Sequence, residues 1–210
     1  MKIAVFGSTG NVGILLVEQA LTEGYDVIAY ARNPSKLTIT HDHLTVIQGE
    51  LSDEAMIERT IAEVDAVISV MGPSGKSKGT PITQGMRHII AAMNKHGVRR
   101  LIALSTASSK DPNDKPGIKL KAMIALVKTA TPDAYADIVG WSDVIRALNL
   151  DWTLMRVLLL NDRPKTGNVK TGYLGRDELG TPVSRTDLAD FMLKQVNDAK
   201  YVRQAPIITN

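Results

Sequence analysis

The 210-residue sequence contains no cysteine, which excludes disulfide bonds, thiolate metal sites and cysteine nucleophiles. It has no apolar run of the ~20 residues that a membrane-spanning helix needs. Neither charge sign is in large excess, because the formal net charge is +3, too small to indicate a nucleic-acid partner. A secretory signal peptide is also missing, since the apolar run 2–6 leads straight into a glycine turn. We therefore expect a cytoplasmic protein without a nucleic-acid or membrane partner.

That glycine turn is the most informative stretch of the chain. Residues 7–13 read GSTGNVG and stand between an apolar strand at 2–6 and a helical pattern that ends at Gly24. Strand, glycine turn and helix in this order bind the pyrophosphate of a dinucleotide. Gly7 permits the tight turn, Gly10 lets the diphosphate approach the backbone, and Gly13 lets the helix pack closely on the strand. The spacing is G-x-x-G-x-x-G rather than G-x-G-x-x-G, so the prediction depends on the placement as well as on the glycines.

The remaining chain alternates strands with helices, which predicts an α/β fold: a Rossmann-like, doubly wound parallel sheet of about six strands in a three-layer αβα arrangement. We expect one domain over 1–210, with a small irregular substrate-side lobe at 159–183. The strands expected after the first lie at 25–31, 44–48, 64–71, 99–104 and 151–158, with further short strands at 168–173 and 205–209.

The end of the second predicted strand lacks the carboxylate that an NAD site usually presents to the adenosine ribose. Arg32 and Lys36 stand there instead. Because a guanidinium suits a 2′-phosphate, this favours NADP(H) as cofactor over NAD(H). The alternative is that both cations are merely solvated.

Two other stretches give weaker signals. His41 and His43 could bind a metal, but no third ligand is evident nearby, so we expect a solvated loop and no metal site. The glycine- and lysine-rich loop 72–79 follows a central strand and could form a mobile lid. It does not have the G-x-x-x-x-G-K-[ST] spacing of a Walker A loop.

The sequence resembles a known family. MKIAVFGSTGNVG at 1–13, ARNPSK at 31–36, GELSD at 49–53, SVMGP at 69–73 and LSTAS at 104–108 are similar to the NmrA-like, atypical short-chain dehydrogenase group of NAD(P)-binding proteins. That group includes biliverdin and flavin reductases. The likeness continues in the helix before Asn149 and so spans most of the chain.

The resemblance implies roles for individual residues. Ser8 and Thr9, with residues 10–12, would contact the diphosphate, and Glu50 and Leu51 would lie near the adenine. The nicotinamide side would be lined by Val70, Met71 and Gly72. Ser105 matches the active-site serine position of the wider dehydrogenase family. The cofactor-binding residues expected in total are Gly7, Ser8, Thr9, Gly10, Asn11, Val12, Gly13, Arg32, Asn33, Lys36, Glu50, Leu51, Val70, Met71, Gly72 and Ser105.

The Tyr-x-x-x-Lys pair of typical short-chain dehydrogenases is missing. Tyr135 is followed four residues later by Val139, and Tyr173 by Asp177. Tyr135 falls on the apolar side of its predicted helix, which favours packing over a role as a catalytic acid. For Ser105, donation to an acceptor or to the nicotinamide carboxamide and a purely structural role are both open.

Two functions follow from these residues. The first is an NADPH-dependent reductase that passes hydride to a flavin, quinone or similar conjugated acceptor, with the protein acting mainly by positioning. The second is a redox sensor that binds NADP(H) without turnover and acts through a protein partner. The sequence leaves the substrate and the oligomeric state open.

Overall fold

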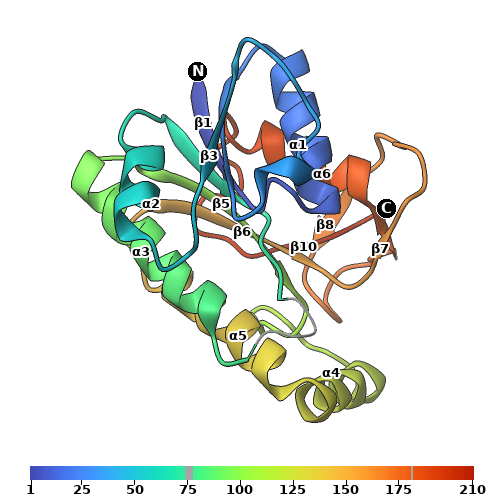
Figure 1. Ribbon diagram of the computed structural model, residues 1–210. Coiled ribbons are helices and arrows are strands. Elements are labelled where there is room, and N and C mark those ends of the chain that lie inside the picture. The colour runs from blue at the N-terminus through green and yellow to red at the C-terminus, as the bar shows by residue number, and fades with distance from the viewer. Residues whose placement is uncertain (74–77, 181) are drawn as a thin grey trace.

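The computed structural model describes residues 1–73, 78–180 and 182–210, and its core is an open, mostly parallel sheet (Figure 1). Within these ranges eight strands lie in the order β3-β2-β1-β4-β5-β6-β10-β8, all parallel except β8, which pairs antiparallel with β10. A separate two-stranded ribbon joins β7 to β9. The strands are β1 (Lys2–Phe6), β2 (Asp26–Ala31), β3 (Leu44–Gln48), β4 (Ala66–Ser69), β5 (Arg100–Thr106), β6 (Asp151–Val157), β7 (Leu160–Asn161), β8 (Lys170–Gly172), β9 (Val183–Ser184) and β10 (Ile207–Thr209).

The helices begin and end at the residues that local chemistry favours. Asp53 caps α2 by accepting a hydrogen bond from the Met56 amide, and the Ser184 hydroxyl does the same for α6. Gly97 ends α3 in the left-handed conformation, with φ at 71°. The helices are α1 (Asn11–Thr22), α2 (Glu54–Ile61), α3 (Pro81–His96), α4 (Ile118–Ala130), α5 (Pro132–Arg146) and α6 (Arg185–Lys194), with a short 3₁₀ turn η1 (Pro34–Lys36).

Helices cover both faces of the sheet, so the predicted three-layer Rossmann-like fold is confirmed. Along β1, Ile3 and Val5 pack on the side of α1 and α6, whereas Ala4 and Phe6 pack on the side of α2, α3 and α5. This alternation follows from the two-residue period of a strand. Because every residue of β1 after Lys2 is buried, the strand reads as a continuous apolar run.

The sheet is larger than the expected six strands. The short segments at 168–173 and 205–209 contain β8 and β10, and these join the edge beyond β6 rather than standing apart. The segment 159–183, expected to form an irregular lobe, therefore contributes β8 to the main sheet. Its first strand, β7, pairs with β9, which begins at the last residue of this segment. In the part of the chain that the structure describes, no helix is both long and apolar enough to cross a bilayer.

A buried ion pair holds the long connection between β5 and α4 against the sheet. Arg156 of β6 is fully buried, and its guanidinium contacts the Asp114 carboxylate at 2.5 and 3.0 Å. The same guanidinium donates to the backbone carbonyls of Ser109 and Ala205. Burial opposes ionisation of Asp114, but the hydrogen bonds and charge of Arg156 outweigh it and hold the pKa of the carboxyl below its usual value.

Asp114→Asn is therefore expected to lower the free energy of unfolding by about 3–5 kcal/mol, because it leaves a buried guanidinium without a counter-charge. Urea unfolding measures the change. The matched control is Asp162→Asn, which removes a carboxylate that is 81% exposed beside Arg185 and is expected to cost less than about 1 kcal/mol. Equal losses in the two variants would contradict the assigned role of the Asp114–Arg156 pair.

Candidate cofactor-binding site

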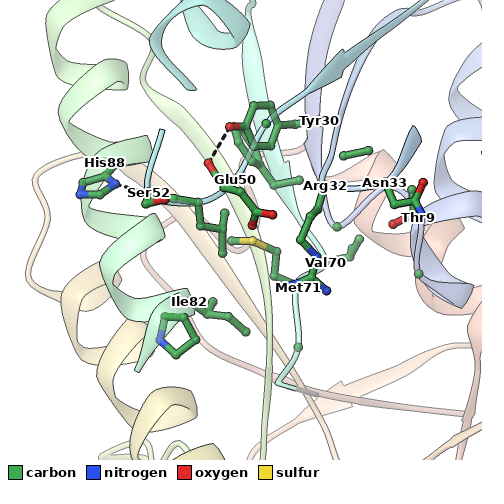
Figure 2. A pocket seen from close by; sticks show the side chains of 18 of the residues that line it. Thr9, Tyr30, Arg32, Asn33, Glu50, Ser52, Val70, Met71, Ile82 and His88 are labelled. Atoms are coloured by element: carbon green, nitrogen blue, oxygen red, sulfur yellow. Dashed lines mark hydrogen bonds between the residues drawn. The ribbon is translucent and has the colours of Figure 1, made fainter. Parts of the chain in front are cut away.

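A cavity of about 480 Å³ opens where β1, β2, β3 and β4 end at their carboxyl termini (Figure 2). Strands β2 and β4 pair with β1 on opposite sides, so the direction in which successive strands are added to the sheet reverses at β1. Ligands bind at such a reversal in open α/β sheets, because the loops there diverge and leave a crevice. The predicted cofactor residues that line the cavity are Gly7, Thr9, Gly10, Arg32, Asn33, Lys36, Glu50, Leu51, Val70, Met71 and Gly72.

The glycine turn after β1 is packed so tightly that no side chain can be added at Gly7 or Gly13. A Cβ on Gly13 would lie 2.1 Å from the Gly7 carbonyl oxygen, so helix α1 sits directly on the turn, as the sequence predicts. Gly7 has φ of +83°, and a Cβ there would lie 2.9 Å from the Met71 amide nitrogen. The turn is thus held between α1 and the end of β4.

Helix α1 starts at the edge of the cavity, with Gly10 in the lining, and the backbone amides of its first turn have no side-chain cap. Gly10 is the N-cap residue; it has no side chain to accept from these amides, and no acidic residue occupies the first turn. The first amides of a helix have no intrahelical partner and carry the positive end of the helix dipole. This is the arrangement that binds the phosphates of a dinucleotide.

Ser8 does not line the cavity, although the resemblance places its side chain at the diphosphate. It is fully buried, and its hydroxyl donates to the Tyr30 carbonyl oxygen at 2.9 Å. The hydroxyl therefore ties the turn after β1 to the end of β2. Asn11, Val12 and Gly13 also lie outside the cavity lining. Of residues 7–13, only Gly7, Thr9 and Gly10 therefore line the cavity.

Two cations stand at the end of the cavity formed by β2. Arg32 and Lys36 flank the short η1 turn, which Asn33 caps by accepting from the Ser35 amide and hydroxyl. Among the described residues, neither cation has a carboxylate within 4.0 Å. Figure 2 shows the Arg32 side chain reaching into the same hollow as Glu50 and Met71. Both positive charges are therefore available to an anionic ligand.

The opposite wall comes from the loop after β3. The Tyr30 hydroxyl donates to the Glu50 carbonyl oxygen at 2.7 Å, and Gly49 packs so closely on the Tyr30 ring that a Cβ would lie 2.2 Å from its hydroxyl oxygen. Burial, reinforced by the charges of Asp53 and Glu50, raises the pKa of Tyr30 to about 12. The phenol is thus a fixed neutral donor that positions the loop carrying Glu50 and Leu51.

Helix α3 supplies residues that the sequence analysis did not identify. His88 lines the cavity, and its Nδ1 lies 2.8 Å from the Leu51 carbonyl oxygen. Because a carbonyl only accepts, Nδ1 carries the proton. Gly85 lies one turn earlier, where a Cβ would meet the Leu51 side chain at 2.8 Å. Helical spacing alone could not reveal this contact, since Leu51 and His88 are 37 residues apart.

The two expected catalytic side chains lie elsewhere. Ser105 is 1% exposed and outside the cavity lining. Its hydroxyl lies 2.8 Å from that of Ser142, which donates to the Ile138 carbonyl at 2.7 Å, so Ser105 is the donor to Ser142. Tyr135 is half-buried in α5 and lines a second cavity beside Lys128. Of the expected lid, residues 74–77 lie outside the described residues.

The expected solvated loop at 41–43 has an internal structure of its own. The His43 ring Nδ1 lies 2.7 Å from an Asp26 carboxylate oxygen, and the His41 ring accepts from the His43 amide. Across the described ranges, no three residues of metal-binding type come together.

Comparison with known proteins agrees with this geometry. A family model described as NAD(P)H-binding matches residues 7–199, nearly the whole chain. The chain belongs to this NAD(P)H-binding family. The match begins at Gly7, the first glycine of the turn, and takes in every residue of the cavity lining except Phe6.

Individual relatives support the same conclusion. Oxidoreductase stcQ of Emericella nidulans is 27% identical over 225 aligned residues, which cover 94% of this chain and 78% of the relative. A wide-type short-chain dehydrogenase/reductase from Veillonella parvula, solved in complex with NADP, superimposes with a TM-score of 0.81 at 20% identity over 100% of this chain and 94% of its own. ChuY, an anaerobillin reductase from Escherichia coli O157:H7, gives a TM-score of 0.79 at 20% identity over 100% and 97% of the two chains. At these identities the two solved structures show the fold alone.

Gly13→Ala is expected to lower the free energy of unfolding by about 1–3 kcal/mol and to weaken NADP(H) binding, because the new methyl group overlaps the Gly7 carbonyl. Urea unfolding and cofactor titration measure the two effects. Gly117→Ala is the matched control, since its φ is −67° and no atom lies within 4 Å of the added Cβ. A Gly13→Ala variant as stable as that control would refute the close contact.

Proposed function

We propose that this protein is an NADPH-dependent reductase that transfers hydride to a flavin, quinone or similar conjugated acceptor. The observation that carries the cofactor half of the proposal is the pair of unneutralised cations, Arg32 and Lys36, at the end of β2. The reductase half is supported by the sequence similarity to oxidoreductase stcQ, which is 27% identical over 94% of this chain and 78% of the relative. ChuY, an anaerobillin reductase, has the same fold.

The residues present fit a phosphorylated dinucleotide. The amides at the start of α1 would hold the diphosphate, and Arg32 and Lys36 would hold a 2′-phosphate. Glu50 and Leu51 would lie beside the adenine, and Val70, Met71 and Gly72 beside the nicotinamide. NADPH, when bound, supplies a hydride from C4 of its nicotinamide. The acceptor takes up this hydride together with one proton, so that NADP⁺ and the two-electron-reduced acceptor are the products.

The protein's own part in this reaction is positioning. The chain lacks the Tyr-x-x-x-Lys pair, and the Ser105 proton is held by Ser142. A proton from solvent or from the acceptor itself is therefore the source that fits the described side chains. The rate enhancement would come from holding the two reactants in the reactive geometry.

NADPH is expected to bind more tightly than NADH, because a charge-assisted contact to the 2′-phosphate contributes roughly 1.5–3 kcal/mol, or about ten- to a hundredfold in affinity. Titration of both cofactors into wild type and Arg32→Ala measures this. The variant is expected to lose that factor for NADPH and to bind NADH nearly as wild type does. Arg59→Ala, an exposed arginine on α2 outside the cavity, is the matched control. Equal wild-type affinities for the two cofactors would refute the NADP assignment.

The second candidate is an NADP(H)-binding sensor without turnover that acts through a protein partner. The burial of Ser105 favours it, because no hydroxyl from the expected catalytic position is free to act on an acceptor. The cofactor cavity serves this function equally well. The two candidates differ in whether bound NADPH is consumed.

NADPH oxidation across a panel of flavins, quinones and tetrapyrroles separates the two. Turnover of at least one acceptor is expected, together with little change in Ser105→Ala, since its hydroxyl faces Ser142, and persistence of turnover in Tyr135→Phe. Loss of turnover in Tyr135→Phe with intact NADPH binding would establish a tyrosine acid and contradict the positioning mechanism. Tight NADPH binding with no acceptor reduced would favour the sensor.

A further inference from the structure

A second cavity of about 640 Å³ lies beyond the carboxyl end of β5. Its walls come from the segment after β5, helix α4, the start of α5 and Leu174 of the C-terminal lobe. Figure 1 shows α4 at the lower end of the molecule beside α5, away from the central sheet. None of the residues that line this cavity lines the cofactor cavity.

The mouth of this cavity is strongly basic. Lys110, Lys115, Lys121 and Lys128 line it, and within the described ranges none of them has a carboxylate within 4.0 Å. The one acidic residue in the lining is Asp114, whose charge is matched by the buried Arg156. Four lysines therefore face one cavity without compensation, in a chain whose net charge is only +3.

The interior of the cavity is apolar. Ala107, Ile124 and Leu174 are buried and form its floor. Tyr135 adds an aromatic ring, and the Lys128 ammonium lies 5.8 Å from the centre of that ring. An apolar floor with an aromatic wall suits a planar, conjugated body, and a rim of lysines suits acidic groups attached to it.

The second cavity is joined structurally to the cofactor cavity. β4 and β5 are parallel neighbours, so the residues that follow them leave the sheet at the same edge. Asp137 of α5, two residues after Tyr135, accepts hydrogen bonds from the Ile82 and Thr83 amides at 3.0 and 2.7 Å. Ile82 lines the cofactor cavity. The aromatic wall of one cavity is thus fixed to the wall of the other.

We propose that the cavity under α4 binds a planar, apolar small molecule that carries carboxylate, sulfonate or phosphate groups, with the lysines selecting the acidic groups and Tyr135 packing on the planar body. That this ligand is the hydride acceptor rests on the proposed reductase function, whereas the binding itself does not. The acceptor would then be an acidic conjugated compound rather than a neutral one.

A pair of fluorescent probes tests the binding without any turnover. 8-Anilino-1-naphthalenesulfonate carries an acidic group, and N-phenyl-1-naphthylamine has nearly the same aromatic body without it. Each is titrated into the protein saturated with NADP⁺, which occupies the cofactor cavity. The sulfonate is expected to bind more tightly than the amine. Lys121→Gln/Lys128→Gln is expected to weaken sulfonate binding about two- to tenfold and to leave amine binding unchanged.

Two further variants locate the effect. Lys119→Gln removes the same charge from the same helix outside the lining and is expected to leave both probes unaffected. Tyr135→Ala is expected to weaken both probes, because the ring contacts the aromatic body in either case. The proposal is overturned if wild type does not bind the sulfonate, if the double variant affects both probes alike, or if Lys119→Gln lowers sulfonate affinity per lysine as much as the double variant.

The outcome is separable from that of the reductase proposal. Lysine-dependent binding of the sulfonate in a protein that oxidises no NADPH would uphold the binding site and refute the reductase. If turnover is found, the double variant is expected to raise the KM for FMN more than the KM for riboflavin, since the two acceptors differ in a phosphate. Equal changes in the two KM values would show that this cavity does not hold the acceptor.

Discussion

The close approach of helix α1 to the turn after β1 is the constraint on which the rest of the site depends. Because residue 13 is glycine, the start of α1 can pack directly against the Gly7 carbonyl; a Cβ on Gly13 would lie 2.1 Å from that oxygen. Gly7 in turn touches the backbone at the end of β4, so one turn fixes the spacing of α1, β1 and β4. Helix α1 therefore starts beside the crevice at the strand reversal, and the positive end of a helix dipole favours anions.

Polar side chains at the carboxyl edge of the sheet serve mainly to hold this frame. Ser8 ties the first turn to β2, Asp137 ties α5 to the start of α3, and Arg156 ties β6 to the segment after β5. Ser105 belongs to the same group, because its hydroxyl is bonded to Ser142 of α5. These polar groups are therefore engaged in hydrogen bonds that hold the structure together. This agrees with a site whose chemistry comes from its cofactor.

Much of this was accessible from the sequence because it is local. Strand periodicity and the glycine turn involve contacts within a few residues, and each leaves a recognisable sequence pattern. That the residues after these strands meet in one cavity was predictable for a different reason. In a parallel sheet every strand end arrives at one edge, so the residues after each of four strands had to meet there. The prediction of an NADP(H) preference also depends only on the side chains that follow β2.

The sequence by itself determined the fold class, the position of the glycine turn and the cations beside it. Only the tertiary structure decided which side chains are free to act. The Ser105 hydroxyl is occupied by a residue 37 positions away, and His88 reaches the cavity by holding Leu51, also 37 positions distant. The four lysines under α4 become one basic rim only when the segment after β5 folds against α4 and Arg156 neutralises Asp114. Such pairings join segments that are far apart in the sequence, so no local pattern predicts them. Closing the intervening loops costs conformational entropy, and the pairings form only when the folded core brings the segments together.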